Sequence, residues 1–158
     1  MKIREYEPSR DRQAVRTCFV DLQDFERKLD PRIPPGEQVA DAYLDLMYRR
    51  CQEFDGALLV AEVDGVVVVF VTVLTRYRSP EPDDDPLEHG FVSDLVVLAA
   101  HRGRGFGRSL LRPAEAQARS AGAGVLRLSV KAGNAAALAL YSGEGFAAWE
   151  IYLEKPLL

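Results

Sequence analysis

Two runs of β-branched residues in the middle of the chain are its clearest structural signal. They span residues 57–63 and 66–75 and are joined by Asp64-Gly65, a dipeptide typical of a tight hairpin turn. The near-continuous valines of the second run predict a strand covered on both faces, so we expect helices to pack against the sheet. A further strand is predicted over residues 89–98.

Apolar positions spaced by three and four residues predict three helices, and an alanine-rich stretch predicts a fourth. In the first of them, Val15, Cys18 and Leu22 belong to one stripe that runs over about residues 10–29. The other three helices are expected over residues 39–51, 105–121 and 134–142.

Shorter strands are predicted over residues 2–6, 125–130 and 146–153, where polar and apolar residues alternate. Strands and helices then follow one another in the order β-α-α-β-β-β-α-β-α-β. This order predicts an α/β fold and a single domain over residues 1–158.

The composition agrees with one compact domain, since 47% of the 158 residues are hydrophobic and 28% are charged. The formal net charge of -4 disfavours nucleic acid as a partner, although 16 of the 20 basic residues are arginines that could still cluster locally. The longest apolar run is too short to cross a membrane, and the first residues lack the apolar core of a signal peptide. We therefore expect a cytoplasmic protein with no membrane partner.

The segment richest in candidate chemistry lies between a predicted strand and a predicted helix and reads Arg102-Gly103-Arg104-Gly105-Phe106-Gly107-Arg108-Ser109. Alternate glycines let several backbone N–H groups point at one place, and the helix that follows adds the positive end of its dipole. The arginines suit a pyrophosphate. A dinucleotide fingerprint and a P-loop both fail, because Arg108 stands where they require glycine and lysine respectively. A tight turn with solvent-facing arginines remains the alternative.

Residues 94–111 resemble the acetyl-CoA binding motif of the GNAT family of N-acetyltransferases, Arg/Gln-x-x-Gly-x-Gly/Ala, with Arg102, Gly105 and Gly107 at the matching positions. A second block resembles the C-terminal motif of the same family and contains Leu128-Ser129-Val130, Asn134, Ala137, Leu140-Tyr141 and Gly145-Phe146. The resemblance implies an α/β (α+β) fold with a mixed, mostly antiparallel central sheet flanked by helices. The fourth and fifth strands of that sheet would splay apart to admit the cofactor.

Acetyl-CoA is the cofactor that the resemblance implies, and no metal site is expected. The implied cofactor-binding residues are Leu95, Val96, Val97, Arg102, Gly103, Arg104, Gly105, Phe106, Gly107, Arg108, Ser109, Asn134 and Tyr141. A backbone N–H near Val97 would polarise the thioester oxygen. A second role for Asn134 is the N-cap of the helix that it precedes.

Tyr141 is the predicted general acid, because a phenol with a pKa of about 10 is protonated at neutral pH. Its alternative role is packing alone. The general base is left open by the residues themselves, because Ser93 stands where many family members have glutamate. Asp94 is our candidate for the base, with Glu88 and His89 as the other proton acceptors on the same strand.

The function implied is an acyl-CoA-dependent N-acetyltransferase that moves an acetyl group to a primary amine by direct attack in a ternary complex. The alternative is a non-catalytic acyl-CoA-binding or sensing module, which Ser93 favours. The acceptor would be a small-molecule or peptide amine, and acids at Glu26, Asp30 and residues 83–85 favour a cationic one. A homodimer through the apolar C-terminal residues 149–158 is one option, and a tail strand that completes the chain's own sheet explains the same residues.

Overall fold

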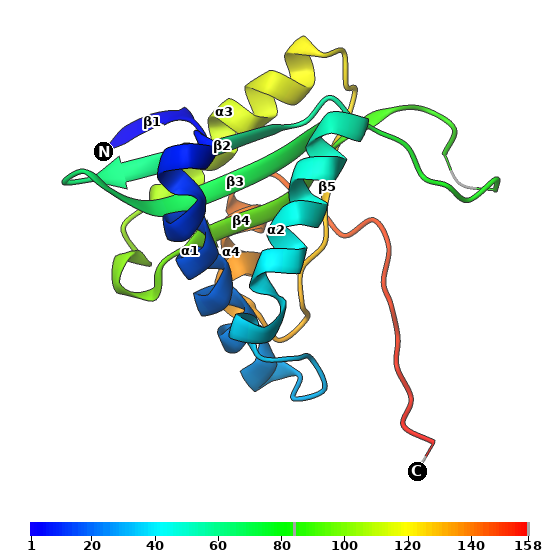
Figure 1. Ribbon diagram of the computed structural model, residues 1–158. Helices are drawn as coiled ribbons and strands as arrows, with labels where there is room; N and C mark the ends of the chain where they lie inside the picture. Colours follow the sequence, from blue (N-terminus) through cyan, green and yellow to red (C-terminus); the bar gives the residue numbers. More distant parts are fainter. Residues whose placement is uncertain (84, 158) are drawn as a thin grey trace.

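The computed structural model describes residues 1–83 and 85–157, and these form one five-stranded sheet with helices on both faces (Figure 1). The strands are β1 (Lys2–Glu5), β2 (Ala57–Val63), β3 (Val66–Tyr77), β4 (His89–Val97) and β5 (Leu126–Leu128). The helices are α1 (Pro8–Leu29), α2 (Gly36–Glu53), α3 (Phe106–Ser120) and α4 (Ala135–Gly143). Neighbouring strands follow the order of the chain and are antiparallel, except that β4 and β5 are parallel. The mixed, mostly antiparallel sheet flanked by helices is confirmed.

The hairpin of β2 and β3 turns at Asp64 and Gly65, as the sequence predicts. Both residues have positive φ values, 52° and 79°, which match the right-handed twist of the flanking strands. Residues 67–75 of β3 are all buried, because helices cover both faces of this central strand.

Two apolar cores lie on opposite faces of the sheet. On one face, α1 and α2 cover the sheet, and the buried residues include Val15, Phe19, Leu44, Phe70 and Val96. On the other face, α3 packs against Val71, Val73 and Val92 through Leu110, Leu111 and Ala114. Gly90 allows α3 to approach closely, since a Cβ there would lie 2.7 Å from that of Ala118. No helix in the described part of the chain is long and apolar enough to cross a membrane.

A cluster of ion pairs fastens β1 to α1 and β2. Arg4 donates from Nη1 and Nη2 to the two carboxylate oxygens of Asp11, at 2.6 and 2.8 Å, and it also pairs with Glu62. Arg10 reaches the same Glu62 oxygen at 2.5 Å, and the backbone N–H of Glu7 donates to Asp11 at 2.8 Å. Asp11 is almost fully buried, so these bonds replace the water that its charge has lost.

The predicted last strand over residues 146–153 is wrong. No strand forms between residues 146 and 157, and the segment runs away from the sheet beyond β5 (Figure 1). A strand needs a neighbour to satisfy its backbone groups, and β5 itself is only three residues long, shorter than the predicted 125–130. Alternating sequence alone therefore does not place this segment in the sheet.

Candidate active site

A β-bulge in β4 sets the direction of the candidate side chains. Thr72 of β3 faces Asp94, whereas the next residue, Val73, faces Val92, so Ser93 is an extra residue in β4. Val92 belongs to the core under α3, whereas Asp94 contacts α2 and Val96 lies in the core under α1 and α2. Regular alternation would have put these three residues on one face. The bulge therefore turns Asp94 toward the paired helices.

Beyond the bulge, β4 and β5 separate. The two strands pair only between Gly90–Val92 and Leu126–Leu128, whereas Leu95, Val96 and Val97 continue to pair with β3 on the other side. In the described part of the chain, no strand lies against this stretch of β4 on its β5 side. The separation agrees with the splay expected from the sequence and leaves backbone groups available to an extended ligand.

The glycine turn leads from this stretch of β4 into α3. Gly103 and Gly105 have φ values of 75° and 79°, a left-handed conformation that glycine adopts without strain. The first hydrogen bond of α3 runs from the N–H of Ser109 to the carbonyl of Gly105 at 3.1 Å. Among the described residues, no acceptor is found for the N–H groups of residues 104–108. The turn therefore offers a set of free donors at the positive end of a helix.

The arginines of the turn differ in what they contact. Arg102 donates to Asp21 of α1 at 2.6 Å and to the Val97 carbonyl at 2.9 Å, and its guanidinium lies 5.0 Å from the centre of the Phe25 ring. Arg108 pairs with Glu144 at 2.5 Å. Arg104 is exposed and makes no ion pair with the described residues. Arg102 thus connects the turn to α1, and Arg104 is the arginine open to an incoming anion.

The carboxylates of Asp94 in β4 and Glu26 in α1 lie close enough for their charges to interact. The Tyr43 hydroxyl of α2 donates to Asp94 at 2.7 Å, and the Ser93 hydroxyl donates to its other oxygen at 2.7 Å. Burial raises the pKa of Asp94. Glu26 of α1 is half-buried, and its pKa is raised by burial and by the charge of Asp94, whereas the charge of Lys131 lowers it. The sequence gives no sign that Glu26, Tyr43 and Lys131 belong together.

The charges of the same two carboxylates also act on Tyr141 of α4. Burial raises its pKa to about 12, and the charges of Asp94 and Glu26 act in the same direction. Its ring meets that of Phe146 edge-on, with 5.7 Å between the centroids. The phenol is therefore protonated throughout the physiological pH range, which is the state needed in a proton donor.

Residues at the start of the last two helices have clear structural roles. Asn134 caps α4, because its side chain accepts a hydrogen bond from the N–H of Ala137 at 3.1 Å. A Cβ on Gly107 would lie 3.2 Å from Leu140 and 3.6 Å from Val97, so a small residue lets α3 fit between β4 and α4. Neither role excludes a contact with a cofactor.

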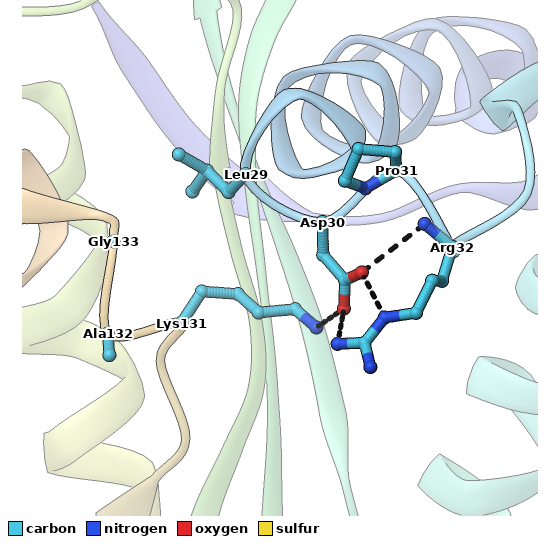
Figure 2. Close-up of a pocket in the computed structure, with 7 residues that line it drawn as sticks. All are labelled: Leu29, Asp30, Pro31, Arg32, Lys131, Ala132 and Gly133. Carbon is cyan, nitrogen blue, oxygen red and sulfur yellow. Dashed lines mark hydrogen bonds and ion pairs between the residues drawn. The ribbon is translucent and has the colours of Figure 1, made fainter. Parts of the chain in front are cut away.

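A cavity of about 580 Å³ opens where the end of α1 meets the loop after β5. It is lined by Leu29, Asp30, Pro31, Arg32, Lys131, Ala132 and Gly133. Figure 2 shows the Asp30 carboxylate between the Lys131 amine, at 3.7 Å, and the Arg32 guanidinium, at 2.7 Å. Both signs of charge are therefore present at the rim, and Glu26, in the last turn of α1, precedes Asp30 by four residues.

Other candidates from the sequence lie apart from this cluster. Glu88 is exposed and pairs with Arg76 at 2.8 Å, whereas His89 is buried against the ring of Tyr77. In the acidic loop, Asp85 pairs with Arg127, Asp83 is exposed, and Asp84 lies outside the described residues.

Comparison with known proteins gives consistent results. The model of the acetyltransferase (GNAT) family matches residues 19–146. Over 114 residues, 70% of this chain, the sequence is 31% identical to the L-2,4-diaminobutyric acid acetyltransferase of Nocardia farcinica, and the match covers 54% of that protein. The chain thus spans about half the length of this curated relative.

Two solved structures show the same fold. A mutant of the BH1408 protein from Bacillus halodurans superimposes with a TM-score of 0.85 and 20% identity, and all of both chains is covered. Aminoglycoside N-acetyltransferase AAC(6')-Iy, crystallised with CoA, superimposes with a TM-score of 0.67 and 18% identity over 98% of this chain and 99% of that chain.

Proposed function

Because this chain belongs to the acetyltransferase (GNAT) family, whose members use acetyl-CoA, we propose that it transfers the acetyl group to the primary amine of a small molecule. The donor and the acceptor would be bound at the same time, and the amine would attack directly. The observation that carries the proposal is the combination of an unpaired stretch of β4 with free N–H groups in the glycine turn that follows.

The residues around this gap fit the proposed cofactor. The free N–H groups of residues 104–108 and the Arg104 guanidinium would bind a pyrophosphate. The open side of β4 at Leu95–Val97 would pair with the amide groups of an extended arm, and the N–H of Val97 would polarise a carbonyl oxygen. Acetyl-CoA, when bound, supplies an acetyl group activated as a thioester.

Glu26 and Asp94 would together prepare the amine. Glu26 is the less enclosed of the two carboxylates, so we assign it the role of proton acceptor for the incoming ammonium group. Asp94 accepts hydrogen bonds from Tyr43 and Ser93, and in its ionised form it raises the pKa of Glu26, which makes Glu26 a stronger base. Tyr141 would give its proton to the thiolate that leaves.

The acceptor would be a cationic amine of small size. Asp30 lines the cavity between α1 and the loop after β5, and Glu26 precedes Asp30 by four residues, so a cationic amine in this cavity would lie beside negative charge. The presence of Lys131 and Arg32 at the cavity also suits an acceptor that carries a carboxylate as well as an amine. The relative from Nocardia farcinica, named for a diamino acid, supports this choice of class.

The cofactor site is tested by the calorimetric titration of acetyl-CoA into Arg104→Ala. We expect binding to weaken by about threefold to tenfold, because one charge-assisted contact to the pyrophosphate is lost. Arg112→Ala is the matched control, since Arg112 is an exposed arginine further along α3, and it should bind like the parent chain. Equal affinities for all three proteins would contradict the proposed pyrophosphate site.

The proposed base predicts the pH dependence of kcat/KM. Activity should rise with pH as Glu26 loses its proton, and the pKa of this step lies above the usual 4.5 because of burial and the charge of Asp94. Asp94→Asn removes a charge that raises this pKa, so the acidic limb should move to lower pH. Lys131→Met removes a charge that lowers it, so the limb should move to higher pH. Ionisation of the acceptor amine affects the parent chain and all variants equally. If the acidic part of the pH profile of kcat/KM stayed at the same pH in both variants, Glu26 would be excluded as the base.

A further inference from the structure

The carboxylate of Asp21 connects α1 to the short segment between β4 and the glycine turn. One of its oxygens accepts a hydrogen bond from the Arg102 guanidinium at 2.6 Å and another from the backbone N–H of Ala99 at 3.0 Å. The two donors lie at opposite ends of the single 3₁₀ turn Ala99–His101, which Arg102 caps. Asp21 therefore holds both ends of this turn against α1.

The side chain of Arg102 is held by three partners. Besides its bond to Asp21, Nε donates to the Val97 carbonyl at 2.9 Å. The guanidinium carbon also lies 5.0 Å from the centre of the Phe25 ring, within the range of a cation–π contact. These contacts direct the guanidinium back toward the end of β4.

The backbone of Val97 faces the open side of β4. The N–H of the next residue, Leu98, donates to the Val68 carbonyl at 2.9 Å. Because backbone groups of successive residues in a strand point to opposite edges, the N–H and the carbonyl of Val97 point away from β3. On that side β5 does not pair with this stretch. Arg102 caps the carbonyl, so the N–H of Val97 is the group that remains there for a ligand.

We propose that Asp21 is a positioning residue for the thioester of acetyl-CoA. It holds Arg102 against the Val97 carbonyl and ties the N–H of Ala99 to α1, and both contacts fix the end of β4 in the orientation that the Val97 N–H needs. The inference rests on the proposed function, because it takes this N–H as the donor that polarises the acetyl carbonyl. Such a donor is effective when it is oriented before the reaction begins.

The same contacts relate the proposed base to the proposed donor. Glu26 follows Phe25 directly in α1, and α1 is one continuous helix. The contacts of Asp21 and Phe25 with the end of β4 therefore also set the position of Glu26 relative to Val97. A misplacement of about 1 Å can lower a rate by about 10²-fold.

Asp21→Ala tests the positioning role by separating kcat from affinity. We expect kcat to fall by about tenfold to 10²-fold, because a misplaced N–H polarises the carbonyl less. The affinity for CoA, which lacks the acetyl carbonyl, should match that of the parent chain, because Arg104 and the N–H groups of residues 104–108 bind the pyrophosphate. A loss of CoA affinity as large as the loss of kcat would show that Asp21 only holds the glycine turn, and would overturn the proposal.

The matched control is Asp41→Ala. Asp41 also pairs with an arginine of α1, Arg16 at 3.2 Å, but it makes this contact from α2. Its kcat and CoA affinity should equal those of the parent chain. Both variants should keep the parent melting temperature, because the pairs of Asp21 and Asp41 are partly exposed and such pairs contribute little to stability.

The stretching band of the acetyl carbonyl measures its polarisation directly. Acetyl-CoA labelled at the carbonyl carbon is bound to each protein, and difference infrared spectra record the band. A hydrogen bond from a fixed donor weakens the C=O bond, so the band should lie at higher frequency in Asp21→Ala than in the parent chain or in Asp41→Ala. Equal frequencies in Asp21→Ala and the parent chain would overturn the proposal.

Exchanging the two charges separates the backbone contacts from the ion pair. Asp21→Arg combined with Arg102→Asp keeps opposite charges at the two positions but removes the acceptor for Ala99 and the donor for the Val97 carbonyl. Its kcat and carbonyl band should therefore resemble those of Asp21→Ala. Recovery of the parent values would show that the ion pair alone matters, and would contradict the positioning role.

The infrared measurement also keeps this inference apart from the proposed function, because it needs bound acetyl-CoA but no acceptor amine. A band that differs between Asp21→Ala and a parent chain that acetylates no amine would support the positioning role and contradict the transferase. A parent chain that acetylates an amine, with the same kcat and the same band in Asp21→Ala, would support the transferase and overturn the positioning role.

Discussion

Replacing Tyr141 with phenylalanine is expected to lower kcat for amine acetylation by about 10² to 10⁴-fold, the usual range for a positioned proton donor. The phenol is the proposed source of the proton for the departing thiolate, and its pKa of about 12 keeps that proton in place at neutral pH. The KM for acetyl-CoA should change little, because the ring and its packing against Phe146 are retained. Steady-state rates measured from released thiol give both parameters.

The control for this variant is Tyr77→Phe. Tyr77 is also half-buried and packs against Phe91, but it lies at the far end of β3 from the carboxylates. Its kcat should equal that of the parent chain. If Tyr141→Phe retained more than about a tenth of the parent kcat, Tyr141 would have only a packing role.

Replacing Asp11 with alanine is expected to lower the free energy of unfolding by about 3–5 kcal/mol, the usual cost of breaking a buried ion pair by removing one partner. Asp11 accepts two hydrogen bonds from the Arg4 guanidinium and one from the N–H of Glu7. Its loss removes all three and leaves Arg4 with its bonds to Glu62 and to the Glu5 carbonyl. Urea unfolding at neutral pH measures the effect. The control is Asp45→Ala, which breaks an exposed pair with Arg12 and should cost less than about 1 kcal/mol.

The ion pair between Asp11 and Arg4 also predicts how the free energy of unfolding depends on pH. The hydrogen bonds from Arg4 lower the pKa of Asp11 below its usual 3.8. The folded state therefore binds this proton less readily than the unfolded chain, so the stabilisation is complete above pH 3.8 and is lost as the pH falls through the lowered pKa. The unfolding free energies of the parent chain and Asp11→Ala should converge in this acidic range. A constant difference between them would contradict an ionised Asp11.

Local patterns predicted most of the fold. The turn at Asp64 and Gly65 follows from residues that tolerate positive φ, and the helices follow from apolar periodicity, which neighbouring residues determine. The failed strand over residues 146–153 has the right alternation but lacks a neighbouring strand. Pairing is a property of the whole sheet, so this failure could not be read from the segment alone.

The candidate site was predicted less completely for a similar reason. The glycine turn and Tyr141 stand out because short motifs contain them. The bulge at Ser93 depends on the register between β3 and β4, which the sequence of one strand does not determine. Glu26 lies on α1, far from Asp94 and Tyr141 in sequence, and only the packing of α1 against the sheet brings their charges into one environment.

Acetyl transfer itself is the most direct test of the proposed function. Purified protein is incubated with acetyl-CoA and with 2,4-diaminobutyrate, an aminoglycoside or a polyamine in separate reactions. Mass spectrometry detects the acetylated amine, and a thiol reagent measures the released CoA. We predict an acetylated amine in at least one reaction, with one CoA released for each acetyl group transferred and with the rate strongly reduced in Tyr141→Phe. Binding of acetyl-CoA without the acetylation of any amine would contradict the proposed acetyltransferase activity and favour a non-catalytic acyl-CoA-binding module.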